Sequence, residues 1–406
     1  MNAKLRRTLE RMYHKVVTAT FTVVGRLPKR ELFFFESFHG RQYSDNPRAI
    51  YEYIQSQHPE ANCIWAVKKG FEQPFIDNDV PYVRRMGLNW LLTMPRAKYW
   101  IFNTRMPKWM KKTAGTTFVQ TWHGTPLKRL GLDIQQVNMP DTDTQRYREN
   151  FRQESARWDY LISPNAYSTA IFKRAFAYDG PVLEIGYPRN DILQDEEHLA
   201  ANRRHVLQKL GLKEDQKIIL YAPTWRDNQF HKKGAYKYDN QFPFADVLAL
   251  DSEIVVLLRT HYLVVDAFDI DQYQGRVLDC GKYPDIRDLY LISDLLITDY
   301  SSVMFDYAFT KRQMLFYMYD EAEYNQEIRG FYFDPQKELP GAIVADKKEL
   351  VAEIDQQLVS PISPPVHPRY QAFYDKYCLT EQGTTASERL LATLTNQDKG
   401  ERQLGE

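Results

Sequence analysis

Two histidines follow predicted strands in settings that suit proton transfer. His123 stands on a glycine turn directly after an apolar run, and His261 follows a strand that also carries Arg259. An imidazole titrates near neutral pH and a guanidinium binds phosphate oxygens in bidentate fashion, so this combination suits phosphoryl chemistry. A structural role for each histidine is the alternative interpretation.

A second polar group surrounds the start of a predicted helix. Asp299, Ser301 and Ser302 follow the apolar run 295–298, and Asp306 lies one turn into the helix. A helix N-terminus carries unpaired N–H groups and a partial positive charge, so a phosphate can bind there with the serine hydroxyls as further donors. Simple capping is the alternative, because Ser and Asp are favoured capping residues.

Several weaker candidates share one feature, which is their place in a loop just after a predicted strand. They are Gly124, Thr125, Lys128, Asn190, Thr224 and Arg226. Each is a weak signal alone, because loops at strand ends are usually polar. Together they predict one site, since ligands of open parallel sheets bind beyond the carboxyl ends of the strands.

The elements that must position these residues form an α/β pattern in two domains. Predicted strands cover residues 32–37, 63–67, 99–103, 117–122, 160–163 and 182–185, and then 217–222, 254–259, 276–279, 295–298 and 314–317. A chain of 406 residues also exceeds the size at which a single core keeps growing. We therefore expect one domain over residues 31–195 and a second over 196–406, with a final helical segment, 367–394, crossing back to the first.

Residues 1–30 differ from the rest in charge, with eight Lys or Arg against the single Glu10. Apolar residues recur at spacings of three and four, which predicts an amphipathic helix: Leu5, Leu9, Met12, Val16, Ala19 and Val23. Such a helix would bind an anionic membrane surface. Packing on its own domain is the alternative.

Composition excludes several classes of protein. The 53 basic and 53 acidic residues give no basic excess, which argues against a general nucleic-acid binder. The three cysteines are far apart, so neither a disulfide framework nor a thiolate metal site is predicted, and a reducing cytoplasm fits.

No apolar run approaches the roughly 20 residues that span a bilayer. The glycine-rich motifs of NAD enzymes and P-loop ATPases are absent from the sequence.

Five ordered motifs resemble the CDP-glycerol glycerophosphotransferase family, which builds wall teichoic acid. They cover residues 35–47, 120–128, 221–226, 259–261 and 298–302. The resemblance implies a GT-B fold, with two Rossmann-like domains facing a central cleft. It also implies transfer of glycerol phosphate from CDP-glycerol to a hydroxyl of a polyprenyl-diphosphate-linked disaccharide or growing teichoic acid chain, with release of CMP, at the cytoplasmic face of the membrane.

The motif match also assigns roles to residues. His123 and His261 take the positions of two essential histidines, and we assign the role of base to His123. The residues expected around the donor are Asn190, Thr224, Arg259, Thr260, Asp299, Ser301, Ser302 and Asp306. Those expected around the acceptor or a phosphate are Gly124, Thr125, Lys128 and Arg226.

Three alternatives stay open on the sequence alone. CDP-ribitol could replace CDP-glycerol, a nucleotide-sugar could serve a GT-B glycosyltransferase, or the chain could be a catalytically silent scaffold. Single transfer and polymerisation are equally compatible with the motifs. No cofactor is expected to be required; nearby carboxylates could hold Mg²⁺ with donor phosphates, but no ligand cluster indicates it.

Overall fold

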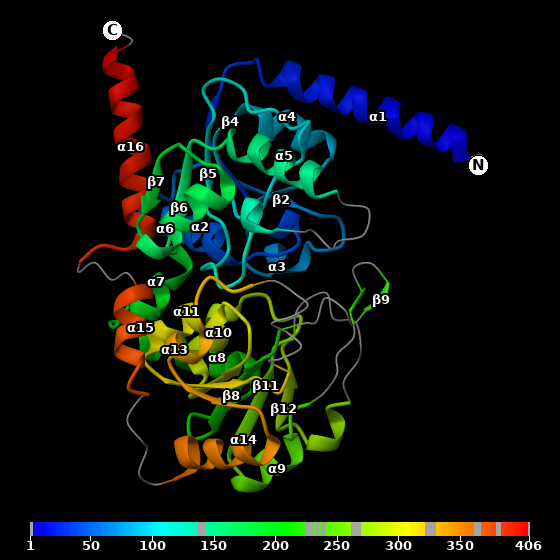
Figure 1. Cartoon of the computed structure of the whole chain (residues 1–406). Coiled ribbons are helices and arrows are strands. Elements are labelled where there is room, and N and C mark those ends of the chain that lie inside the picture. Colours follow the sequence, from blue (N-terminus) through cyan, green and yellow to red (C-terminus); the bar gives the residue numbers. More distant parts are fainter. Residues whose placement is uncertain are drawn as a thin grey trace. The chain divides into compact units, whose positions relative to one another are not determined.

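The computed structural model describes residues 3–135, 143–224, 230–232, 235–236, 241–260, 269–320, 330–360, 367–378 and 383–404 (Figure 1). The chain folds into two compact units. Unit 1 comprises Met1–His123, Asp143–Asp191 and Glu381–Glu406, and unit 2 comprises Gly124–Thr142 and Ile192–Thr380. Residues 124–142, which the sequence analysis placed in the first domain, therefore group with unit 2.

Unit 1 is built on a seven-stranded parallel sheet with the order β3-β2-β1-β4-β5-β6-β7. Its strands are β1 (Arg30–Glu36), β2 (Cys63–Val67), β3 (Tyr82–Arg84), β4 (Ala97–Phe102), β5 (Thr117–Gln120), β6 (Tyr160–Ser163) and β7 (Val182–Glu184). The strand order reverses between β1 and β4, which makes this pair the topological switch point of the sheet.

The core of unit 1 is rich in aromatic side chains. Phe35 of β1 stacks on Trp65 of β2, with ring centroids 5.3 Å apart, and Tyr51 of α2 (Asp45–Gln57) packs edge-on against both rings. Leu390 and Leu394 of α16 (Ala386–Leu404) complete the same core. The strands are buried runs rather than alternating ones, as expected for a parallel sheet covered on both faces.

The start of α16 is fixed by a carboxylate of unit 1. Asp191 accepts hydrogen bonds from the backbone N–H groups of Ala386 and Ser387, at 3.0 and 3.1 Å, and from the Ser387 hydroxyl at 2.7 Å. The segment 367–394, which we expected to be helical throughout, forms two helices instead. They are α15 (Tyr370–Tyr377), in unit 2, and α16, in unit 1.

Unit 2 contains a six-stranded parallel sheet with the order β12-β11-β8-β13-β14-β15. The strands are β8 (Lys217–Ala222), β11 (Ile254–Leu258), β12 (Val277–Asp279), β13 (Leu295–Thr298), β14 (Gln313–Tyr317) and β15 (Ala342–Val344). Here the order reverses between β8 and β13. Counted along the chain, six strands of each unit follow the order 3-2-1-4-5-6 of Rossmann sheets.

Other elements cover these sheets or lie beside them. The remaining longer helices are α5 (Thr144–Ser155), α6 (Ala166–Phe176), α8 (Leu199–Leu210), α9 (Phe244–Leu250), α10 (Ile286–Ile292) and α14 (Lys347–Ile354). Shorter helices are α3 (Gln73–Ile76), α4 (Leu88–Thr93), α7 (Asp191–Gln194), α11 (Val303–Tyr307) and α13 (Pro335–Glu338). Two short strands, β9 (Phe230–Lys232) and β10 (Ala235–Tyr236), pair antiparallel.

The N-terminal helix α1 spans Ala3–Val24 (Figure 1, blue). It packs on unit 1 through Phe21, which is buried and lies 5.5 Å from Trp90 and 5.7 Å from Trp109 between ring centroids. The apolar face expected from the sequence is a different one, and its members Val16 and Val23 are 63% and 60% exposed. The packed stripe and the exposed stripe are therefore separate faces of one helix.

Candidate functional site

In unit 1 the loops that follow β1, β4 and β5 leave the same edge of the sheet. The three strands are neighbours, and Glu36 pairs in register with Phe102, which in turn pairs with Gln120. The loop that carries His123 therefore starts next to the loop that follows β4. Because β1 and β4 form the switch point, a ligand is expected at this edge.

His123 is held in a defined tautomer. Its Nδ1 lies 2.7 Å from the backbone carbonyl oxygen of Asn103. A carbonyl only accepts hydrogen bonds, so Nδ1 carries the proton. His123 is exposed over part of its surface, but the loops around the imidazole desolvate it and lower its pKa below the ordinary value. The hydrogen bond to Asn103 and the nearby Asp45 carboxylate oppose this shift only in part. The ring is therefore neutral near pH 7, and Nε2 presents a lone pair.

The backbone before His123 has an unusual conformation. Trp122 has a φ of 52°, in the left-handed region that non-glycine residues seldom adopt. Its indole packs against Phe176 and stacks on the His123 imidazole, with centroids 4.6 Å apart in both cases. The backbone N–H of Trp122 donates to the side chain of Gln120 at 2.9 Å. Such local strain persists where the surroundings enforce it, which is common at functional sites.

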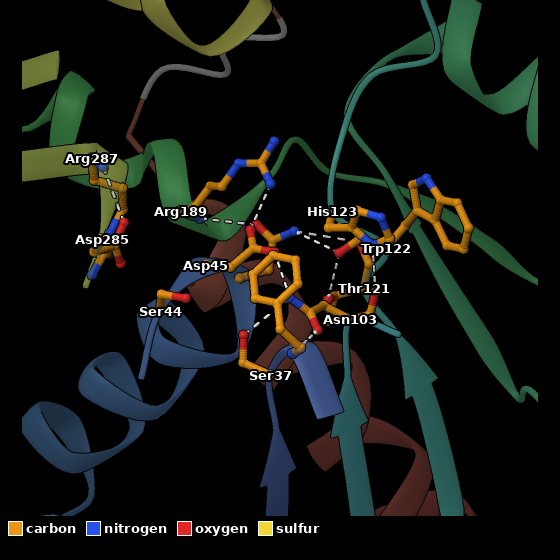
Figure 2. A network of polar contacts seen from close by, with 12 residues as sticks. Ser37, Ser44, Asp45, Asn103, Thr121, Trp122, His123, Arg189, Asp285 and Arg287 are labelled. Carbon is orange, nitrogen blue, oxygen red and sulfur yellow. Dashed lines mark hydrogen bonds and ion pairs between the residues drawn. The ribbon is translucent and has the colours of Figure 1, made fainter. Parts of the chain in front are cut away.

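A buried network supports this histidine (Figure 2). The Asn103 side chain donates to Asp45 at 2.6 Å and to Ser37 at 3.1 Å, and it accepts from the N–H of Phe38 at 2.9 Å. Asp45 also accepts from Arg189 at 2.5 Å. Asn103 thus ties the loops of β1 and β4 together. The sequence analysis did not identify it, although a polar residue directly after a buried strand was the available signal.

Asn46 and Asn190 lie near the same network. Asn46 accepts from the backbone N–H of Arg189 at 3.2 Å and donates to the carbonyl of Trp122 at 3.3 Å. Asn190 is buried in unit 1, whereas the other residues expected around the donor, where described, belong to unit 2. Its assignment to the donor stays a prediction.

Basic side chains lie around the same edge. Arg85 pairs with the fully buried Glu36 at 2.9 Å, and Arg105 lies over the ring of Phe151 at 4.4 Å. His39 has a φ of 59°. The residue is exposed, but desolvation of its ring by the surrounding loops lowers its pKa to about 4, and the positive charges of Arg85, Arg41 and Arg105 act in the same direction. The sequence analysis assigned no role to these side chains.

In unit 2, Asp299 bridges the switch point of the second sheet. Its carboxylate accepts from the backbone N–H of Thr224, after β8, at 2.8 Å, and from that of Tyr300 at 2.6 Å. Thr298 adds a hydrogen bond from its hydroxyl to the carbonyl of Ala222 at 2.7 Å. The structure thus brings two residues expected around the donor, Asp299 and Thr224, together at the place where this sheet should bind a ligand.

The two serines after Asp299 cap the next helix only weakly. Ser301 accepts from the N–H of Val303 at 3.4 Å, and Ser302 makes no capping hydrogen bond through its side chain. A Cβ on Gly124 would lie 3.2 Å from the Ser302 hydroxyl, so the glycine permits a close approach of the backbone. Asp306 is buried one turn into α11.

Arg259 is engaged by the backbone of its own unit. Its Nη1 donates to the carbonyls of Cys280, Gly281 and Tyr283, at 2.5, 3.2 and 2.7 Å. Thr260 adjoins the same turn, since a Cβ on Gly281 would lie 2.8 Å from its hydroxyl. The geometry gives Arg259 a structural role, and phosphate binding by its remaining donors stays a prediction.

The remaining expected site residues divide into two groups. Gly124, Thr125 and Lys128 belong to unit 2, where Lys128 forms a β-bridge with Phe331, although the sequence analysis placed them with His123 in the first domain. His261 and Arg226 lie outside the described residues. The predicted opposition of the two histidines therefore stays a prediction.

Within the described ranges, no three His, Cys, Asp or Glu side chains are grouped so that they could hold a metal ion. The described cysteines Cys63, Cys280 and Cys378 are buried, and burial raises the pKa of each thiol.

The family model described as CDP-Glycerol:Poly(glycerophosphate) glycerophosphotransferase matches residues 19–396. The chain belongs to this family. Among curated members, the teichoic acid glycerol-phosphate transferase of Staphylococcus aureus (strain NCTC 8325 / PS 47) is 46% identical over 392 residues. That alignment covers 96% of this chain and 99% of the relative.

Two further members of the family are similar to this chain. The teichoic acid poly(glycerol phosphate) polymerase of Bacillus subtilis (strain 168) is 46% identical over 392 residues; the match covers 95% of this chain but only 52% of the relative, so the chain spans about half its length. A histidine-to-asparagine variant of the wall teichoic acid polymerase TagF, soaked with CDPG, superposes with a TM-score of 0.83 at 36% identity, covering 98% of each chain. The GT-B fold class expected from the family resemblance is confirmed.

Proposed function

We propose that the protein transfers glycerol phosphate from CDP-glycerol to a hydroxyl group of a teichoic acid acceptor, with release of CMP. Family membership supports this reaction class. The observation that carries the assignment within the chain is His123, a neutral imidazole with Nδ1 protonated and Nε2 available as an acceptor. It lies at the edge of the unit 1 sheet where a ligand is expected.

The chemistry follows from that protonation state. The acceptor hydroxyl gives its proton to Nε2 of His123 as its oxygen attacks the β-phosphorus of the donor. A new phosphorus–oxygen bond forms, and the bond from the same phosphorus to the bridging oxygen breaks. CMP leaves with the electron pair. Negative charge grows on the phosphoryl oxygens and on CMP, so positioned hydrogen-bond donors lower the barrier.

We assign the donor to unit 2. The backbone N–H groups of Thr224 and Tyr300 at the second switch point are ordered by Asp299, and Ser301 and Ser302 follow Tyr300 in the chain. His261, which follows the strand of Arg259, is assigned to stabilise charge on the departing CMP. This role rests on the family motif alone.

Glycerol is the preferred alcohol over ribitol. The relatives with 46% identity are named for glycerol phosphate, and the match to the family model argues against a nucleotide-sugar donor. The acceptor is proposed to be a polyprenyl-linked glycan or a growing teichoic acid chain.

We further propose that α1 places the protein on the cytoplasmic face of the membrane. Met12, Val16 and Val23 are exposed on α1, beside basic residues such as Lys15 and Arg26. An exposed apolar stripe flanked by cations suits binding at the surface of anionic lipid. Among the described residues, no helix combines the length and hydropathy needed to cross a bilayer.

The reaction is tested by CMP release. Purified protein is incubated with CDP-glycerol or CDP-ribitol and a synthetic lipid-linked acceptor, and CMP is quantified. Release from CDP-glycerol that depends on both the acceptor and His123 is the expected result. Equal release by a His123→Gln variant would refute the assignment of the base. Sedimentation with anionic liposomes, with and without residues 1–25, tests the membrane proposal separately.

A further inference from the structure

Three residues of unit 1 occupy matching positions in the loops that follow three adjacent strands. The register aligns Glu36 of β1, Phe102 of β4 and Gln120 of β5. His39, Arg105 and His123 each lie three residues beyond one of these positions. Because the three strands are parallel neighbours, the three loops start side by side at the carboxyl edge of the sheet. His39 and Arg105 flank the switch point itself.

The loops are also connected to one another. The rings of Phe38 and His123 lie 5.7 Å apart, and the N–H of Phe38 donates to the side chain of Asn103. Gly40, with a φ of 78°, fits so closely that a Cβ would lie 2.9 Å from the carbonyl oxygen of Ala66. The positions of His39 and Arg41 on either side of this glycine are therefore fixed by the sheet.

Around the loops that follow β1 and β4, positively charged side chains outnumber carboxylates. Glu36 pairs with Arg85, and Asp45 pairs with Arg189. Among the described residues no carboxylate pairs with Arg41 or Arg105. Arg105 lies over the aromatic rings of α5, and the Nε atom of Arg41 is buried without a hydrogen-bond partner in the described structure. Partly buried guanidinium groups without counter-ions are costly, and an anionic ligand would compensate them.

We propose that Arg105, Arg41 and His39 form a phosphate-binding subsite beside His123. The occupant is a phosphodiester of the acceptor, adjacent to the hydroxyl that His123 deprotonates. The two arginines supply charge and paired donors, and the neutral His39 imidazole supplies one N–H.

The choice of occupant rests on the proposed function. If His123 removes the proton of the acceptor hydroxyl, the groups next to it in unit 1 meet the acceptor's end. A chain that already carries glycerol phosphate ends in a hydroxyl three carbons from a phosphodiester, within reach of neighbouring loops. The subsite would therefore favour acceptors that carry glycerol phosphate over the bare disaccharide.

Turnover with two acceptors tests the specificity. A synthetic lipid-linked disaccharide is compared with the same molecule carrying one glycerol phosphate. An Arg105→Met variant keeps the apolar contact with Phe151 but removes the charge. We expect its KM for the phosphorylated acceptor to rise at least tenfold, with the KM for the bare acceptor and for CDP-glycerol within twofold of wild type. Arg84→Met, which removes an arginine whose side chain is 65% exposed, is the matched control.

The possible outcomes separate the two proposals. An unchanged KM, an equal rise for both acceptors, or a rise for CDP-glycerol alone would overturn the subsite while leaving the transfer reaction intact. If wild-type protein releases no CMP with either acceptor, the proposed function fails instead, and the subsite is then decided by binding.

Binding is measured by NMR of the histidine rings in the whole protein, with glycerol 3-phosphate as the anion and glycerol as the uncharged control. The His39 signal is assigned with a His39→Asn variant. We expect glycerol 3-phosphate to shift this signal in wild type and in Arg84→Met but not in Arg105→Met. Equal shifts in all three proteins, or no shift in wild type, would contradict the subsite.

Discussion

The imidazole of His123 donates its Nδ1 proton to the backbone carbonyl of Asn103, 2.7 Å away, in the loop that follows the neighbouring strand. A backbone carbonyl neither titrates nor rotates as a carboxylate does. The tautomer of the proposed base is therefore set by the sheet itself. The Asn103 side chain, which binds Asp45 and the loop after β1, fixes the position of that carbonyl.

Replacement of His123 by glutamine should lower kcat by at least about a hundredfold, because a neutral amide cannot accept the hydroxyl proton. The rate of CMP release at saturating substrates measures this loss. The exposed His58 offers a control, since His58→Gln should retain wild-type activity. A His123→Gln variant within threefold of wild type would exclude His123 as the base.

The acid limb of the kcat/KM profile should lie below pH 6.5. Desolvation of the imidazole by the surrounding loops lowers the pKa of His123 from 6.5, so Nε2 of the free enzyme takes up its proton at lower pH than an ordinary histidine does. The midpoint of the fall in kcat/KM on the acid side should therefore lie below pH 6.5. The rate of CMP release, measured against pH with CDP-glycerol at a concentration below its KM, gives this midpoint. A midpoint above 6.5 would show that another group controls activity.

An Asn103→Ala variant should be less stable than wild type by about 2–4 kcal/mol. It removes three hydrogen bonds, two of them buried, so that the N–H of Phe38 and the carboxylate of Asp45 each lose the bond to Asn103. Urea unfolding measures the change. Asn78→Ala, at an exposed position with one hydrogen bond, should change stability by less than about 1 kcal/mol. Equal effects would mean that the network does not support the fold.

His39 should make the protein less stable in acid. Its pKa is about 4 in the folded protein against 6.5 for the free side chain, so the unfolded chain binds the proton more strongly. The contribution of the neutral His39 to the free energy of unfolding is fully present well above pH 6.5 and is lost as the pH falls towards 4. Because His39 is exposed, solvent screening makes this loss smaller than the full pKa shift would give.

A His39→Asn variant tests this dependence, since asparagine tolerates the left-handed backbone of this position. Urea unfolding at pH 7 and pH 5 should show a smaller acid loss for the variant than for wild type. His58→Asn serves as the control and should follow wild type. Parallel losses in all three proteins would place the acid sensitivity elsewhere.

Arg259→Met should destabilise the protein by about 2–4 kcal/mol, because three carbonyls of the turn after β12 lose their donor. If the role is structural, KM for CDP-glycerol should change little at temperatures where the variant is folded. Arg204→Met, which removes an arginine whose side chain is 60% exposed in the same unit, is the control. A large rise in KM with unchanged stability would support the phosphate role predicted from sequence.

Much of the sheet architecture could be predicted, because buried parallel strands are continuous apolar runs. Residues 63–67, 160–163, 217–222 and 295–298 are strands with the expected bounds. The strand β3 was missed because its three residues are only partly buried or exposed and form no apolar run. The final helical segment was expected to be continuous, since its apolar spacing does not reveal that α15 and α16 pack in different units.

The site was less predictable than the sheets. His123 was found because its motif is local in sequence, whereas Asn103 depends on partners at Ser37 and Asp45 that only the fold brings near. The hydrogen bonds of Arg259 also could not be predicted, because its partners are backbone carbonyls, which every residue has, so no residue type in the sequence marks them. On α1 the exposed stripe was recognised, but the buried stripe with Phe21 was not.

The placement of α16 has a consequence for biosynthesis. Leu390 and Leu394 complete the core of unit 1, whose sheet ends with β7, more than two hundred residues earlier. A ribosome therefore produces all of unit 2 before the last helix that covers the first sheet, so unit 2 can become compact while unit 1 still exposes apolar surface. Nascent chains released at residue 380 should recruit chaperones through the uncovered α2, and addition of the missing helix as a separate peptide should relieve that dependence.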